Sequence, residues 1–319
     1  MERDNFYKLI QEFLKEPPVI IWGSGATIAY GMPSMSDLLN MLKERFEFFD
    51  DKCTNLEEEL GKDNYNQHMP KIRKAIWHRL TSVDEKIPKD ILSNPNRYKG
   101  IKRLIEKFIE PHPYLFNIIT TNYDRVLENV MASNAIPFTD GFTGRLLSLY
   151  DENLFSNNKK GPFVNLVKVH GSLNWFEIDR EIRYYNSRPS AKYEPKIIPP
   201  GKNKYQQSYS EPYRSLIQKS DEIIKESKSL LVVGFGFNDE HLTPRITTQI
   251  NKGVPIIILA KKITQSTRGQ LKIASRYLAL EEYTKGKTKI CFKKASSDQE
   301  TLEKIDGSFW KLDEFMEAF

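Results

Sequence analysis

Short apolar runs recur along the chain and are separated by stretches in which apolar residues have helical spacing. Runs that are rich in β-branched residues and bounded by Gly, Pro or polar residues predict strands buried on both faces of a sheet. They lie at residues 19–22, 116–119, 164–169, 230–233 and 254–259, with a weaker run at 290–292. Because predicted strands alternate with predicted helices, the pattern favours an α/β fold with a doubly wound, Rossmann-like parallel sheet.

The segment between the first two predicted strands has its own composition. Residues 35–112 are rich in Lys, Glu, Leu and Ile, and apolar residues recur there at helical spacing, as at Ile72 and Ile76. We therefore expect a helical insertion subdomain at residues 35–112, set into a core formed by residues 1–34 and 113–319.

Two further segments carry local signals. Residues 176–210 contain many tyrosines, lysines and prolines, which predict a loop-rich segment over the site. Residues 312–319 predict a short terminal helix.

Polar or glycine-rich clusters follow four of the predicted strands. They are Gly-Ser-Gly-Ala-Thr at 23–27, Thr-Thr-Asn-Tyr-Asp at 120–124, His-Gly-Ser at 170–172 and Gly-Phe-Gly-Phe-Asn-Asp at 234–239. In an open parallel sheet the ligand binds at the carboxyl ends of the strands. The four clusters are therefore expected at one edge of the sheet, where they would form a single site.

The first cluster has the composition of a phosphate-binding turn. Gly23 and Gly25 allow a close backbone approach to a pyrophosphate, and a helix start behind them would add free N–H groups. No Gly-Lys-Ser or Gly-Lys-Thr follows, which excludes a P-loop. Ile28 replaces the third glycine of the dehydrogenase motif, and Glu44 lies in a helical pattern, so hydride transfer is disfavoured. A turn that only joins a strand to a helix is the alternative to dinucleotide binding.

Charge and cysteine content narrow the class of protein. The formal charge of +6, from 48 basic and 42 acidic residues, suits an anionic ligand, although a solvated surface is the favoured interpretation. The lysines are scattered, so direct nucleic-acid binding is disfavoured. Cys53 and Cys291 cannot form a four-cysteine zinc site, and we expect no metal. No run approaches the roughly 18 apolar residues of a membrane helix, and no signal peptide is evident, so a cytoplasmic protein is expected.

Taken in order, the clusters resemble the sirtuin-like (Sir2-type) domain family, and most closely its prokaryotic NAD-hydrolysing branch in anti-phage defence. The resemblance rests on the four clusters, with Gly31-Met-Pro33-Ser after the first, and spans roughly residues 18–262. It implies that NAD is the substrate. Asn122 matches the family's asparagine that holds the ribose and water, and His170 matches the catalytic histidine.

The resemblance also implies the remaining contacts with NAD. Asp124 matches an aspartate of the nicotinamide pocket, and Pro33 and Ser34 would lie near the nicotinamide side. The implied phosphate cradle is Gly23, Ser24, Gly25, Ala26 and Thr27, and the implied adenosine-side residues are Gly234, Phe235, Gly236 and Asn238.

Two departures from the family bear on the reaction. Deacylating sirtuins usually carry a four-cysteine zinc module, and they carry Asp-Phe-Arg where this chain has Ser34-Met35-Ser36. Both departures disfavour lysine deacylation. The resemblance then implies hydrolysis of NAD to nicotinamide and ADP-ribose, which would deplete NAD in an infected bacterium. It also implies a homo-oligomer and a partner, such as an ATPase or nuclease encoded beside it.

The residue types fit this chemistry, and several alternatives stay open. The nicotinamide–ribose bond breaks through an oxocarbenium-like transition state; an Asn can position the ribose, and a His can accept a proton. Asn122 is also a favoured helix N-cap, Asp124 a favoured first-turn acid, and His170 a candidate for a satisfied strand-end histidine. Asn238-Asp239 could cap the next helix, and Lys202 or Lys204 could lie near a phosphate.

The function itself has rivals from other classes. A deacylase or ADP-ribosyltransferase would use the same first step with another acceptor, and cyclisation of ADP-ribose is not separated from hydrolysis by the sequence. A non-catalytic module that senses NAD or a related nucleotide and regulates a partner is the third possibility.

Overall fold

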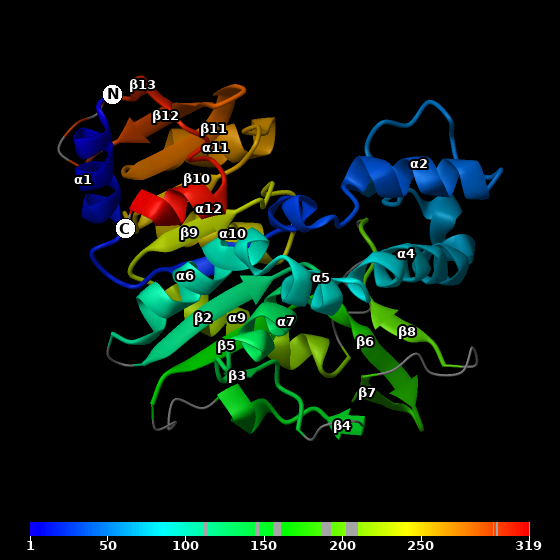
Figure 1. Cartoon of the computed structure of the whole chain (residues 1–319). Coiled ribbons are helices and arrows are strands. Elements are labelled where there is room, and N and C mark those ends of the chain that lie inside the picture. Colours follow the sequence, from blue (N-terminus) through cyan, green and yellow to red (C-terminus); the bar gives the residue numbers. More distant parts are fainter. Residues whose placement is uncertain are drawn as a thin grey trace.

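A nine-stranded, mostly parallel sheet forms the centre of the molecule (Figure 1). The computed structural model describes residues 1–111, 114–143, 147–155, 161–186, 193–201, 210–295, 297 and 299–318. The strand order is β13-β12-β11-β10-β9-β1-β2-β5-β3. The strands are β1 (Val19–Trp22), β2 (Leu115–Thr120), β3 (Phe138–Thr139), β5 (Phe163–Lys168), β9 (Leu230–Val233), β10 (Ile256–Leu259), β11 (Tyr277–Thr284), β12 (Lys287–Lys293) and β13 (Thr301–Asp306).

The strands from β11 to β3 are parallel, whereas β12 and β13 add an antiparallel edge. The predicted doubly wound α/β fold is therefore confirmed. β1 lies between β2, the next strand of the sheet along the chain, and β9, which comes much later in the sequence. Trp22 of β1 is paired with Thr120 of β2 on one side and with Val233 of β9 on the other. This reversal is the switch point at which open α/β sheets bind their ligands.

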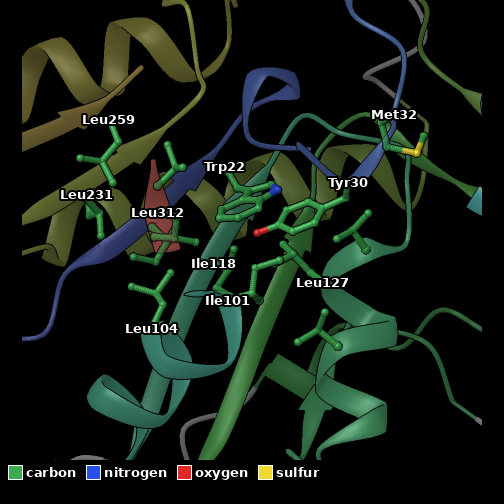
Figure 2. Close-up of a cluster of buried hydrophobic side chains, with 14 of the residues drawn as sticks. Trp22, Tyr30, Met32, Ile101, Leu104, Ile118, Leu127, Leu231, Leu259 and Leu312 are labelled. Atoms are coloured by element: carbon green, nitrogen blue, oxygen red, sulfur yellow. The ribbon is translucent and has the colours of Figure 1, made fainter. Parts of the chain in front are cut away.

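Helices cover both faces of the sheet, because successive side chains of a strand point to opposite faces and both faces are apolar. Ile20 and Trp22 pack in one core cluster, and Val19 and Ile21 pack in the other. The first cluster includes α1 (Arg3–Phe13), α6 (Lys99–Ile109), α7 (Val126–Ser133) and α12 (Leu312–Phe315). The second includes α9 (Tyr213–Glu226), α10 (Leu242–Asn251) and α11 (Gln265–Ile273). Figure 2 shows the first face, where Ile101 and Leu104 of α6 lie beneath Trp22 and Ile118.

The described part of the segment between β1 and β2 is helical, as the apolar spacing predicts. Its α-helices before α6 are α2 (Met35–Arg45), α3 (Leu56–Glu59), α4 (Met69–Asp84) and α5 (Ile87–Ser93). In α4, Ile72, Ile76 and Leu80 are buried. α4 packs on the strands β6 (Gly171–Ile178) and β8 (Pro195–Ile197), and α6 packs on β2. The division of the chain into a core and a helical subdomain stays a prediction. Of the helices in the described residues, none has the length and apolarity to cross a membrane.

The prediction of a loop-rich segment at residues 176–210 is wrong for 11 of its 21 described residues, which form strands. These strands belong to an antiparallel sheet with the order β4-β7-β6-β8, made of β4 (Leu147–Leu149), β6 (Gly171–Ile178), β7 (Glu181–Tyr185) and β8 (Pro195–Ile197). Pro195 begins β8, an edge strand where a missing N–H group is tolerated. Pro199 and Pro200 follow β8 in residues without regular secondary structure, whereas Pro189, Lys202 and Lys204 lie outside the described residues.

We expect Leu104→Ala to lower the free energy of unfolding by about 2–5 kcal/mol, because Leu104 is fully buried beneath the sheet. Leu92→Ala is the matched control, since Leu92 is 82% exposed on α5 and should lose less than about 0.5 kcal/mol. Urea unfolding followed by circular dichroism measures both. Equal losses in the two variants would contradict this packing.

Candidate functional site

The glycine turn after β1 is locked against the turn after β9. Gly23 N donates to Val233 O at 2.9 Å, and Gly25 N donates to Gly234 O at 2.9 Å. A Cβ atom on Gly23 would lie 2.4 Å from Gly234 O, and one on Gly234 would lie 2.1 Å from Ala26 N. The glycines are therefore required for this close approach of two backbones, and the N–H groups of Gly23 and Gly25 already have partners within the protein.

The helix start expected directly behind the turn is not an α-helix. Residues Ser24–Ala26 and Ile28–Tyr30 form two short 3-10 turns, and α2 begins only at Met35. Ser34 caps α2 in a reciprocal capping box with Asp37. The contacts of Ser34 thus explain a helix start, and its predicted place near nicotinamide stays a prediction.

Asn122 is buried at the end of β2 beside the glycine turn. Its Nδ2 donates to Gly23 O at 3.2 Å and to Thr27 Oγ1 at 3.3 Å, while its backbone N donates to Thr120 Oγ1 at 3.0 Å. Because a carbonyl can only accept, Gly23 O fixes which way the amide points. Among the described residues, buried Asn122 Oδ1 then has no hydrogen-bond partner, at a cost that a bound ligand or water would offset.

The capping alternative for Asn122 is wrong, since α7 begins at Val126 and its N-cap is Arg125. The first-turn alternative for Asp124 is also wrong, because Asp124 precedes the N-cap and Glu128 is the acid of the first turn; Asp124 Oδ1 instead accepts from Val126 N at 3.2 Å. Its Oδ2 accepts from Thr27 Oγ1 at 3.1 Å, so Thr27 links Asp124 to Asn122. Burial raises the pKa of Asp124 to about 6, against the lowering effect of the Lys168 ammonium.

Two buried ion pairs hold the loop that carries Asn122 and Asp124. Lys168 is fully buried and donates to Asp124 O at 2.6 Å and to Glu128 Oε1 at 2.5 Å. Arg125 donates from N and Nε to the carboxylate of Asp84 on α4, at 2.7 and 2.6 Å. The sequence analysis missed both pairs. A lysine at the end of an otherwise apolar strand was the available signal for the first.

His170, after β5, lies against a carboxylate from the turn after β9. Its Nε2 is 3.0 Å from Asp239 Oδ2, although not aligned as a hydrogen bond, and each side chain is only 4% exposed. Asp239 Oδ1 accepts from His241 N at 3.0 Å and from Leu242 N at 2.9 Å, so Asp239 also caps α10. The capping role considered for the pair at 238–239 therefore belongs to Asp239, while Asn238 is exposed.

The loops that carry Asn122 and His170 are joined by direct hydrogen bonds. Tyr123 O accepts from Ser172 Oγ at 3.3 Å and from Leu173 N at 3.0 Å. Tyr123 Oη donates to Ile198 O at 2.5 Å, next to β8. The ends of β1, β2, β5 and β9 thus form one connected edge, as the sequence predicts.

The adenosine-side candidates are divided between the core and the surface. Phe235 is buried and its ring lies 5.2 Å from that of Phe237, so it packs in the second core cluster. Gly236 O accepts from Thr264 Oγ1 at 3.2 Å. Ser24 and Asn238 are exposed. In the part of the chain that the structure describes, no group of three His, Cys, Asp or Glu residues could hold a metal ion.

Comparison with known proteins relates this edge to the Sir2 fold. The family model of the SIR2-like domain matches residues 117–255, which include Asn122, His170 and Asp239. No curated protein sequence matches the chain.

The solved structures similar to this chain include a crystal structure of a Sir2 homologue–NAD complex. It has a TM-score of 0.50 and 17% identity, with 88% of each chain covered, and shows that the chain has a Sir2-type fold. A mutant Sir2 homologue with 2′-O-acetyl-ADP-ribose has a TM-score of 0.48 and 17% identity, covering 88% of this chain and 91% of that chain. A mutant Sir2 homologue with ADP-ribose has a TM-score of 0.47 and 17% identity, covering 84% and 88%.

We expect Gly234→Ala to lower the free energy of unfolding by at least about 1–3 kcal/mol, because its φ of 61° and the contact with Ala26 N both oppose a side chain. Gly269→Ala in α11 is the control: a Cβ there meets nothing within 4 Å, and alanine favours the helix. Thermal and urea unfolding measure both variants. A Gly234 variant as stable as the Gly269 variant would contradict the backbone lock.

Asp124→Asn should change how stability depends on pH. In the folded state the pKa of Asp124 is about 6, above its ordinary value of 3.8, so the folded protein binds more protons between these values. The contribution of Asp124 to the free energy of unfolding is therefore fully present below about pH 4. It decreases as pH rises through 6, by up to about 3 kcal/mol. Urea unfolding at pH 4.5 and 7.5 should show that the variant gains stability relative to wild type at the higher pH. The same difference at both pH values would contradict the burial effect.

Proposed function

We propose that the protein hydrolyses NAD at the nicotinamide–ribose bond, giving nicotinamide and ADP-ribose. The observation that carries this proposal is the buried, unpartnered Oδ1 of Asn122, held beside the glycine turn at the switch point of the sheet. The Sir2 homologue whose fold this chain shares was solved with NAD, which supports NAD as the ligand.

Asn122 supplies a fixed acceptor for a water or a ribose hydroxyl. Its amide cannot rotate without losing the bonds to Gly23 O and Thr27 Oγ1, so Oδ1 keeps one direction before any ligand arrives. An acceptor that is already oriented holds a nucleophile or hydroxyl without reorganisation during the reaction. This positioning suits cleavage through an oxocarbenium-like transition state.

His170 is the proposed proton acceptor. It follows β5 directly, and its loop is joined to that of Asn122 through Tyr123 O. When water attacks the anomeric carbon, the electron pair of the C–N bond leaves with nicotinamide, and one water proton must be removed. An imidazole at this edge can take that proton near neutral pH.

Hydrolysis is proposed over transfer to an acyl-lysine or a protein acceptor. Two cysteines cannot form the zinc module of deacylating sirtuins, and Ser34-Met35-Ser36 replaces their Asp-Phe-Arg. In this chain that position begins α2, with Ser34 as its cap. We further propose, on the resemblance of the motifs, that the cytoplasmic protein acts as a homo-oligomer with a partner and depletes NAD in anti-phage defence.

We expect wild-type protein to release nicotinamide and ADP-ribose from NAD, and Asn122→Ala and His170→Ala each to lower the rate at least about 100-fold. Asn96→Ala and His78→Ala are matched controls at exposed positions outside the site and should retain the wild-type rate. Chromatography of the products measures all five proteins, and calorimetry measures NAD binding.

The products distinguish the proposal from its rivals. In the presence of an acetylated peptide, formation of nicotinamide and 2′-O-acetyl-ADP-ribose without ADP-ribose would identify a deacylase. Tight NAD binding without turnover would indicate a sensing module. No binding of NAD would contradict the proposal altogether.

A further inference from the structure

The contact between His170 and Asp239 assigns a second role to a residue that the sequence marks only as a helix cap. We propose that Asp239 is a positioning residue that holds His170 in the Nε2–H tautomer, which leaves Nδ1 as the basic nitrogen of the ring. This inference rests on the proposed hydrolase function for its catalytic consequence, but its structural part can be measured without turnover.

The carboxylate of Asp239 is fixed from both sides. One oxygen accepts from the backbone N–H groups of His241 and Leu242 at the start of the ten-residue helix α10. The other oxygen lies 3.0 Å from His170 Nε2. Hydrogen bonds from backbone N–H groups and the positive end of the helix dipole both favour the ionised carboxylate. The second oxygen of Asp239 is therefore a strong acceptor within contact distance of the imidazole.

The backbone that carries His170 is equally constrained. His170 O accepts from Ile198 N at 2.9 Å. Gly171 has a φ of 86°, and a Cβ there would lie 2.2 Å from Lys196 O. The ring is 4% exposed, so it enters the site from a fixed main chain with little room around it.

The negative charge of Asp239 would stabilise the imidazolium that forms when His170 accepts a proton. A water proton passes to Nδ1 as the water oxygen bonds to the anomeric carbon and the C–N electron pair leaves with nicotinamide. The imidazolium that forms lies against a buried carboxylate, where the attraction is much stronger than in water. The same carboxylate fixes the tautomer before the reaction, which is how an orienting acid supports a general base.

Other titratable groups near this pair come from two elements. The His241 ring on α10 lies 6.4 Å from the His170 ring, centroid to centroid, in an edge-on arrangement. Tyr123, from the loop after β2, interacts electrostatically with Asp239. Any titration of His170 is therefore compared with that of His241 in the same spectra.

The test separates charge from helix capping. Asp239→Asn and Asp239→Ser both keep a side-chain oxygen that can cap α10, but neither carries a charge. Asp221→Asn is the matched control, since Asp221 pairs with Arg245 of α10 at 3.0 Å and is not part of the site. Nitrogen-15 NMR of histidine-labelled protein, assigned with His170→Ala, reports the tautomer and pKa of His170 directly.

We expect wild type and Asp221→Asn to show His170 as the Nε2–H tautomer, and both Asp239 variants to lose that preference and populate the Nδ1–H tautomer as well. In the hydrolase assay the Asp239 variants should lose about 100-fold in kcat with little change in KM and with an altered pH profile. Melting temperatures near wild type would show that the cap is retained.

An unchanged tautomer in Asp239→Asn would overturn the inference, whatever the activity. A wild-type protein without turnover that still shows the Nε2–H tautomer and its loss in the variants would leave the positioning role in place and contradict the hydrolase proposal. The two failures are therefore distinguishable.

Discussion

The close approach of the β1 and β9 turns is the constraint on which the site depends. Gly23, Gly25 and Gly234 bring two backbones together where a single methyl group would not fit. This contact closes the sheet at its switch point and presents Gly23 O to the amide of Asn122. It also places Asp239, five residues after Gly234, against His170 from the neighbouring side. The glycines thus act through geometry rather than through free N–H groups.

Two buried ion pairs stabilise the loop after β2, which carries Asn122. Lys168 is bound by Asp124 O and Glu128, and Asp84 is bound by Arg125, so the loop after β2 is held from β5 and from α4 at once. Removing one partner of a buried pair leaves an uncompensated charge, which is far costlier than removing both. Trp77 of α4 also donates to Leu173 O at 2.8 Å. The helical segment before β2 is therefore part of the support of the site.

The sequence predicts the sheet and the location of the site, because both follow from local patterns. Runs such as residues 19–22 and 230–233 are apolar on both faces, and the polar clusters follow directly behind them. The smaller sheet was missed because the prolines were given more weight than the tyrosines of β7, which favour strands, and because its pairing depends on residues distant in sequence. The contact of Asp239 with His170 was also missed, because it joins residues distant in sequence. Local spacing reveals that one oxygen of Asp239 caps a helix, but not that the other oxygen contacts His170.

The pairing of β1 with β9 has a consequence for the synthesis of the chain. Trp22 is synthesised first, and its neighbour Val233 follows only 211 residues later (233 − 22). Contacts between such distant segments form slowly, because a long loop must first close. Until β9 arrives, Gly23 and Gly25 lack the backbone that orders them, and His170 lacks Asp239. A nascent or truncated chain that ends before β9 therefore carries Asn122 and His170 at a sheet edge that lacks one of its four strand ends.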